Sequence, residues 1–231
     1  MDPLSDLLVV AWQVPAVLEE ADRFMASANT TPEHLTSHIF KPSLDMIEEL
    51  QASQQNHKDM LQSPVFWAMP STADNPADEF YDTKLFPFAL HFQSMESALN
   101  MVLYWAMLLQ VHYNVICLGL HFPPPVNSSE EMNPFNIESP TESPRNSGYG
   151  SMTSVMEEAN KLARYICMSI EYCYRIEHGT LGPQLTCYAQ WILKLYFRKI
   201  DCVRGLAWCL NIKGMKGPGF YSGIELMGFE D

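Results

Sequence analysis

Positive charge is scarce in this chain of 231 residues. Acidic residues outnumber basic ones by 27 to 14, which gives a formal net charge of −13 at pH 7. A domain that grips DNA or RNA needs the opposite balance, because neutralising phosphate groups supplies much of the affinity. A small basic patch remains open around Lys194, Arg198, Lys199 and Arg204, but we expect no direct nucleic-acid contact by this chain as a whole.

Paired cysteines are also missing. No two of the six cysteines stand three residues apart, so the chain has no CxxC pair of the kind that binds zinc or exchanges disulfides. Most of the cysteines fall in apolar segments with helical spacing. We expect them to be reduced, buried thiols in an intracellular protein.

A signal peptide is not recognisable at the start of the sequence, where Met1-Asp2-Pro3 is acidic rather than basic. The most apolar segment, 98–120, is about as long as a membrane span. It contains Asn100, Gln110, His112 and Asn114, which are costly in hydrocarbon. We therefore expect the central buried helix of a globular domain and no membrane contact.

Catalytic patterns are equally hard to find. The sequence has no GxSxG elbow, and His34 and His38 lack the glutamate that HExxH zinc sites place after the first histidine. Gly179 and Gly182 flank a short turn, but Pro183 follows where a phosphate loop would have lysine. We expect no enzyme, no cofactor and no metal site.

Helical periodicity, by contrast, is abundant. From residue 154 onward apolar side chains step by three and four, as on one face of a helix. These are Val155, Ala159, Leu162, Ile166, Ile170 and Cys173. The periodic segments are too long for strands, so the sequence predicts an all-α protein. We expect a single domain over 1–231, an irregular multi-helix bundle of packed helical hairpins.

Proline sets the expected boundaries in the first half. Pro15 should kink or restart the first helix, and Pro42 should interrupt the next, with Ser43 capping a second run. Residues 63–87 are expected to be irregular. A long helix is then expected from Phe88 to about Leu120.

In the second half, residues 123–153 are dense in Ser, Pro, Asn and Glu. Such a segment cannot bury enough apolar surface to offset the entropy of ordering, so we expect one long, flexible, disordered loop inside the domain. A helix should then end at His178 and Gly179. Pro183 should open another helix that reaches Tyr196, and a last helix should cover about 201–212.

Aromatic side chains recur on three of the expected helices. They are Tyr104, Trp105, Tyr172, Tyr188 and Trp191. Rings at these places are candidates for a ligand pocket between helices. They serve equally well as ordinary core, and the sequence leaves both interpretations open.

Two segments resemble the fungal-specific transcription factor domain, the regulatory domain that normally follows a six-cysteine binuclear zinc cluster. They are LYWAMLLQVHYNVI at Leu103–Ile116 and ARYICMSIEYCYRIEHGTLGPQ at Ala163–Gln184. The motif residues are Ala163, Arg164, Ile166, Cys167, Ser169, Ile170, Glu171, Tyr172, Cys173, Gly179, Leu181, Gly182, Pro183 and Gln184. Stretches at 10–22, 86–98 and 202–220 fit other parts of the same domain.

The resemblance implies a helical regulatory domain that controls transcription through protein contacts, as a homodimer or with other regulators. It implies a response to a metabolite, which it does not name, and a nuclear location; otherwise the protein would be cytoplasmic. The chain departs from the family in having no six-cysteine cluster and no basic N-terminal region. The leading hypothesis is thus a non-catalytic transcriptional regulatory domain. The alternative is a small-molecule sensor or adaptor with no DNA role of its own.

Overall fold

The computed structural model describes residues 9–26, 36–60, 64–122 and 152–220. The α-helices are α2 (Val14–Ala26), α3 (Thr36–Met60), α4 (Met95–His121), α5 (Met152–Cys173), α6 (Leu181–Leu185), α7 (Cys187–Lys199) and α8 (Val203–Leu210). Two strands, β1 (Phe66–Pro70) and β2 (Phe88–Phe92), and three short 3-10 turns complete the described part. The turns are η2 (Pro76–Asp78), η3 (Ile176–His178) and η4 (Ile212–Gly214). The loop expected at 123–153 lies outside the described residues, except that its last two positions open α5.

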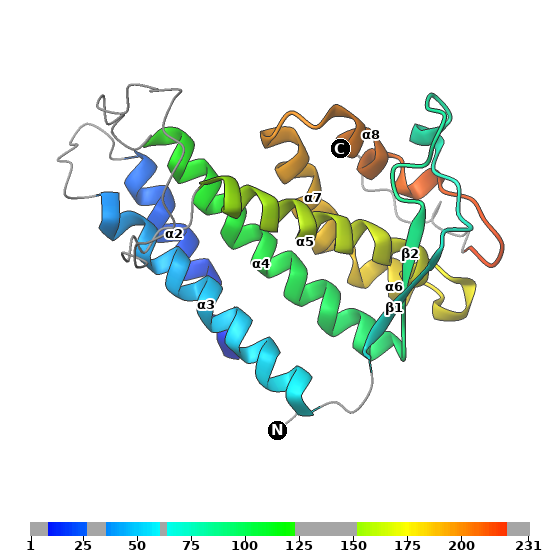
Figure 1. The fold of residues 1–231 in the computed structure, drawn as a ribbon, viewed down its shortest axis with the longest axis horizontal. Helices are drawn as coiled ribbons and strands as arrows, with labels where there is room; N and C mark the ends of the chain where they lie inside the picture. Colours follow the sequence, from blue (N-terminus) through cyan, green and yellow to red (C-terminus); the bar gives the residue numbers. More distant parts are fainter. Residues whose placement is uncertain (1–8, 27–35, 61–63, 123–151, 221–231) are drawn as a thin grey trace, which may run out of the picture.

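Helix α4 is the centre of the arrangement. It packs against α2 and α3 on one side and against α5 and α7 on the other. Figure 1 shows α4 and α5 running antiparallel, with the β-hairpin lying across the end of α5 and the start of α4. The short helix α8 packs against both α7 and η2. The fold is therefore mostly helical, as the sequence predicts.

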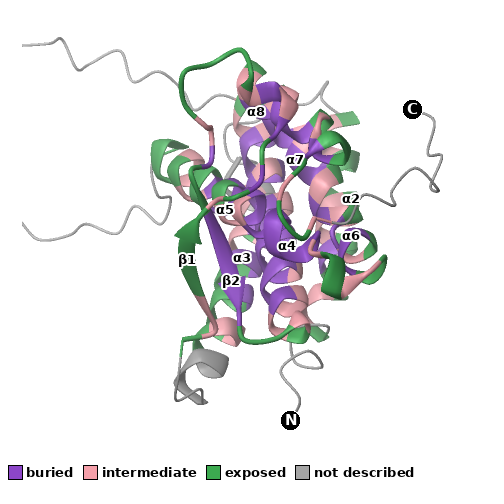
Figure 2. Cartoon of the chain, turned by 90° about the vertical axis from the view of Figure 1, so that its right-hand side faces the viewer, coloured by how far each residue is buried: buried purple, intermediate pink, exposed green. Residues whose placement is uncertain are grey.

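The apolar sequence of α4 is covered by its neighbours. Fifteen of its residues are buried, including the polar residues His112 and Asn114. Figure 2 shows α4 mostly in the colour of buried residues. In the described part of the chain α4 is the one helix long and apolar enough to cross a membrane. Of its most apolar window, 78% is buried inside the protein, as expected of a central core helix.

The β-hairpin corrects the all-α expectation. Strands β1 and β2 pair antiparallel, with Phe66 opposite Phe92 and Pro70 opposite Phe88. The long helix was expected to begin at Phe88, but it begins at Met95. Ser94 caps it by accepting a hydrogen bond from the Ser97 amide at 3.1 Å. β2 is mostly buried, and a buried strand of five residues gives too short an apolar run to be told from the start of a helix.

Of the two expected proline effects, the one at Pro15 is found and the one at Pro42 is not. Pro15 lies in the first turn of α2, where a missing amide costs least, so the helix does restart there. Pro42 lies inside α3 without ending it, contrary to expectation. Ser43 is not a cap: it is buried, and its hydroxyl accepts a hydrogen bond from the Asn114 amide nitrogen at 3.2 Å. Packing on α4 thus holds α3 together across the proline.

The helix boundaries between α5 and α7 differ from those that the sequence predicts. Helix α5 ends at Cys173, five residues before the expected end, because the chain near Phe220 takes over the backbone pairing of Arg175. The Ile176 amide donates to the Gly219 carbonyl at 2.7 Å. Gly179 does have positive φ, 53°, as its expected role at a helix end requires.

Gly182 and Thr186 explain the next turn. A Cβ on Gly182 would lie 1.7 Å from the carbonyl oxygen of Cys173, so only glycine lets α6 approach the end of α5. The helix expected from Pro183 to Tyr196 is broken at Thr186, whose hydroxyl donates to the Pro183 carbonyl at 2.8 Å. This side chain competes with the backbone for hydrogen bonds and separates α6 from α7.

Candidate functional site

The five aromatic candidates do not form one pocket. Tyr104 and Trp105 lie side by side on α4 and line the same groove. Tyr172 lies elsewhere, between Phe92 of β2 and η3. Tyr188 and Trp191 stack on α7, with ring centroids 6.2 Å apart, and Trp191 is half exposed. The groove at Tyr104 and Trp105 is therefore the candidate site.

This groove is formed where α3, α4, α5 and β1 meet, and its cavity measures about 280 Å³. The lining residues are Gln51, Gln54, Gln55, Phe66, Met101, Tyr104, Trp105, Leu108, Glu158, Lys161, Leu162 and Tyr165. One wall is aromatic, and the opposite wall carries glutamine side chains from α3. Sites for small organic molecules combine apolar walls with a few polar groups in the same way.

The aromatic wall is built on Trp105. Phe66 of β1 meets its indole edge-on, with ring centroids 5.2 Å apart and planes at 80°. Tyr165 of α5 lies on another side, with centroids also 5.2 Å apart. Rings held edge-to-face or tilted in this way are favourably packed and lose little side-chain freedom when a ligand arrives. The sequence analysis identified neither Phe66 nor Tyr165 as a candidate. Phe66 fell in a segment that was expected to be irregular.

Tyr104 is the unusual member of the lining. Its side chain is only 5% exposed, but its hydroxyl is not among the fully buried, unpaired polar atoms of the described residues, so the hydroxyl opens to the groove. Burial, with a smaller contribution from the nearby Glu158 carboxylate, raises the pKa of the Tyr104 phenol. The phenol thus stays neutral at physiological pH. A phenol hydroxyl that opens to a groove can donate a hydrogen bond to, or accept one from, a molecule bound there.

Charged and amide groups complete the groove. The Lys161 ammonium lies 3.1 Å from the Glu158 carboxylate, one turn away on α5. Both side chains are partly exposed, at 53% and 36%. Gln54 of α3 directs its amide nitrogen to the Met101 sulfur at 3.7 Å, a weak contact. The site therefore offers opposite charges at its rim and aromatic surface at its wall.

The motif residues of α5 have structural positions. The buried Glu171 carboxylate accepts hydrogen bonds from the Ser71 hydroxyl at 2.7 Å and from the Thr72 hydroxyl at 2.7 Å. The Thr72 amide adds a third at 3.1 Å. Burial alone would raise the pKa of Glu171, but these hydrogen bonds outweigh it and lower the pKa. Glu171 thus fastens the segment after β1 to α5.

The other motif residues divide by exposure. Ala163, Ile166, Cys167, Ser169, Ile170, Tyr172, Cys173, Gly182 and Pro183 are buried, whereas Arg164, Leu181 and Gln184 are exposed. Gly179 is intermediate. The motif therefore maps onto the inner face of α5 and the tight contact between α5 and α6, not onto the groove.

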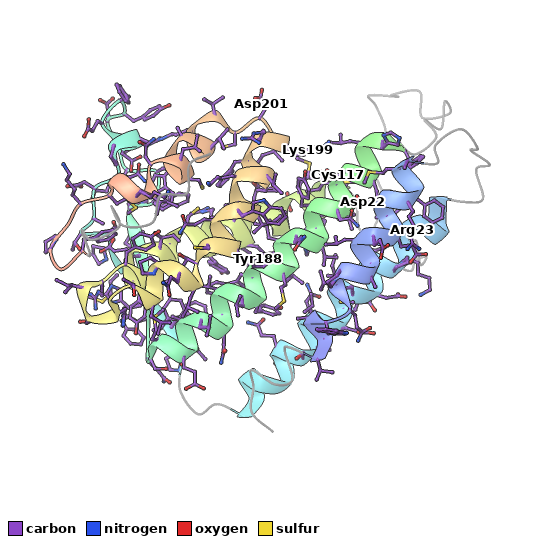
Figure 3. The ribbon with its side chains drawn as sticks, turned by 180° about the vertical axis from the view of Figure 1, so that it is seen from behind. Asp22, Arg23, Cys117, Tyr188, Lys199 and Asp201 are labelled. Atoms are coloured by element: carbon purple, nitrogen blue, oxygen red, sulfur yellow. The ribbon has the colours of Figure 1, made fainter. Side chains whose placement is uncertain are left out.

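A second cavity, of about 290 Å³, lies at the other end of α4, between α2 and α7. Its lining includes Asp22, Cys117 and Lys199, which Figure 3 shows close together. Burial and a hydrogen bond with Cys117 raise the pKa of Tyr113 in the same cavity to about 12. None of the predicted aromatic residues lines it.

The described residues contain neither a metal-binding cluster nor a disulfide bond. The described residues include no group of three or more His, Cys, Asp or Glu side chains placed to hold a metal ion. All six cysteines are free, as expected, but Cys187 is exposed and Cys117 and Cys202 are half-buried rather than buried. No protein-family model, curated protein or solved structure matches the chain.

Proposed function

We propose that the chain is a non-catalytic regulatory domain that binds a small organic molecule in the groove between α3, α4 and α5. The Tyr104 hydroxyl carries this proposal. It belongs to a mostly buried side chain that lines the groove, and it is not among the fully buried, unpaired polar atoms of the described residues. A ligand that hydrogen-bonds to this phenol while covering the half-buried rings of Phe66 and Tyr165 would stabilise the packing of α3 against α4 and α5.

The regulatory part of the proposal concerns transcription. The motif between Ala163 and Gln184 resembles that of fungal transcription factor domains, and it forms the inner face of α5 and the contact with α6. Residues of this kind preserve a fold rather than a reaction. We therefore assign the chain to control of transcription in the nucleus by contact with protein partners, with the groove as its sensor.

The alternative is a sensor or adaptor with no role at DNA. It is favoured by one observation, the net charge of −13, which opposes any approach to nucleic acid by this chain alone. Both functions use the same groove. They differ in whether a DNA-linked partner reads its state.

A thermal-shift screen of metabolites tests the shared part of the proposal. We expect at least one compound to raise the melting temperature of the wild-type chain. Gln54→Trp, which places an indole at the groove, should abolish that shift. Glu48→Trp, at an exposed site on α3 that does not line the groove, should retain it. If no compound stabilises the wild type, the ligand-binding function is wrong.

A reporter assay separates the two functions. The chain is fused to a heterologous DNA-binding domain, and transcription is measured with and without the stabilising compound. A response that is present in wild type and Glu48→Trp but lost in Gln54→Trp supports transcriptional control. An unresponsive reporter, with intact binding, supports the sensor or adaptor instead.

A further inference from the structure

The ion pair at the rim of the groove is replaceable. Glu158 and Lys161 are one turn apart on α5 and partly exposed, and such pairs contribute little to stability because solvent screens them. A molecule that carries both a positive and a negative charge can separate them without leaving either side chain unpaired. A molecule with one charge would strand the other member of the pair.

The aromatic wall adjoins this pair. Phe66 and Tyr165, both half-buried, line the groove together with Glu158 and Lys161, so one small molecule can reach both the rings and the charges. The glutamine side chains of α3 in the lining carry no net charge. Selection by charge in the groove therefore rests on Glu158 and Lys161, and selection by shape rests on Phe66 and Tyr165.

We infer that the groove binds an α-amino acid with an aromatic side chain. Its ammonium group pairs with Glu158, its carboxylate pairs with Lys161, and its ring packs on the half-buried rings of Phe66 and Tyr165. The Tyr104 hydroxyl hydrogen-bonds to the polar part of the ligand. This inference rests on the proposed function, since it names the class of molecule for the same groove.

The size of the cavity agrees with this class. Its volume of about 280 Å³ is just below the roughly 300–1,000 Å³ of ligand pockets, so it suits a single small metabolite rather than a larger cofactor. Opposite charges close together on the protein match the adjacent ammonium and carboxylate groups of an amino acid. An aliphatic amino acid would satisfy the charges but would leave the half-buried rings of Phe66 and Tyr165 uncovered.

Isothermal titration calorimetry on the full chain tests the inference with four probes. L-Tryptophan has the ring and both charges, tryptamine lacks the carboxylate, indole-3-propionate lacks the ammonium group, and L-alanine lacks the ring. We expect L-tryptophan to bind at least about tenfold more tightly than each of the others, the factor that about 1.4 kcal/mol provides.

Two variants test which protein charge pairs with which charged group of the ligand. Lys161→Gln should remove the preference for L-tryptophan over tryptamine, and Glu158→Gln should remove the preference over indole-3-propionate. Glu157→Gln and Lys213→Gln, both exposed and outside the groove, should change neither preference. Because all four side chains are at least partly exposed, we expect these variants to fold, which circular dichroism checks.

The outcomes are distinct. Equal binding of L-tryptophan and either singly charged probe overturns the inference, as does binding that ignores both charge variants. If none of these probes binds, but another compound stabilises the chain and is blocked by Gln54→Trp, the inference fails while the proposed function stands. If no compound binds at all, both fail.

Discussion

The hydroxyl of Thr72 donates a 2.7 Å hydrogen bond to the carboxylate of Glu171, 99 positions later in the chain. Thr72 follows β1, and Glu171 lies near the end of α5, so the bond closes the hairpin onto the helical bundle. With the Ser71 hydroxyl and the Thr72 amide, it satisfies a carboxylate that is only 6% exposed. A buried charge is tolerable only with such partners.

Glu171→Gln should destabilise the protein by about 1–3 kcal/mol, because it replaces charge-assisted hydrogen bonds and turns an acceptor into a donor. Chemical denaturation monitored by circular dichroism measures the loss. Glu157→Gln, an exposed site on the same helix, should change the free energy of unfolding by less than about 0.5 kcal/mol. A variant at Glu171 as stable as wild type would show that the network contributes nothing.

Acid should weaken the protein in a way that depends on Glu171. Its pKa in the folded chain is below the ordinary value near 4.5, so the unfolded state takes up the proton first as pH falls. The contribution of Glu171 is complete above that ordinary value and is lost as pH falls through the folded pKa. We expect the difference in unfolding free energy between wild type and Glu171→Gln to shrink below about pH 4.5.

Histidines make the comparison with the variant necessary. Burial lowers the pKa of His91, His112 and His178 below 6.5, so each protonates more readily in the unfolded chain. Wild type and variant should therefore lose stability together as pH falls below about 6.5. A difference between them that stays constant down to pH 3 would contradict the role given to Glu171.

Tyr104→Phe should leave stability within about 0.5 kcal/mol of wild type, because the phenol it removes makes no hydrogen bond to the described residues. Tyr196→Phe is the matched control. The Tyr196 hydroxyl donates to the Asn160 side chain at 2.9 Å, and its removal should cost about 0.5–1.5 kcal/mol. Thermal denaturation of the two variants measures this contrast. A large loss at Tyr104 would mean that its hydroxyl is satisfied within the protein.

Gly182→Ala should destabilise the protein by about 1–3 kcal/mol or more, since the added methyl overlaps the Cys173 carbonyl oxygen and α6 must shift. Gly179→Ala meets no atom within 4 Å, but its backbone φ of 53° disfavours a side chain. It should cost about 1 kcal/mol, and Gly179→Val should cost at least as much. Urea denaturation should rank Gly182→Ala as the least stable of the alanine variants, and the reverse order would show that α6 accommodates the methyl.

Asp201→Gly should stabilise the protein by about 1 kcal/mol. Asp201 is exposed at the junction of α7 and α8 and has φ of 54°, a conformation that costs energy for any residue with a Cβ. Asp201→Ala keeps the Cβ and therefore the same backbone cost, so it should give no gain. Differential scanning calorimetry can compare the two melting temperatures; equal values would remove the backbone explanation.

Periodicity alone was enough to predict the helical part of the core. The spacing from Ala159 to Cys173 correctly identified the buried face of α5, and the long apolar segment became the central helix α4. These signals succeed because burial on one face repeats with the helical period. The groove was found in part for the same reason, since Tyr104 and Trp105 are neighbours on α4.

The features that the sequence did not predict depend on contacts between residues that are distant in the sequence. Phe66 belongs to the groove because β1 pairs with β2, and that pairing is not visible in a run of five residues. Ser43 was expected to cap a helix, but its hydroxyl accepts a hydrogen bond from the Asn114 side chain. Thr186, which the sequence analysis did not single out, breaks the expected helix by donating its hydroxyl hydrogen to the Pro183 carbonyl. The Ser94 cap was readable, because a serine preceded the acidic first turn of α4.

Backbone hydrogen bonds of Asp74 connect the loop between β1 and β2 to the chain near Lys216. The amides of Asp74 and Lys216 each donate to the other residue's carbonyl, at 2.7 and 3.0 Å. Phe66 in the groove, Thr72 at Glu171 and Asp74 at Lys216 thus lie on one short stretch of backbone. If that stretch opens as one unit, all three contacts are released together, and on the proposed function we expect the exchange rate of the Lys216 amide with solvent deuterium to fall when a ligand occupies the groove.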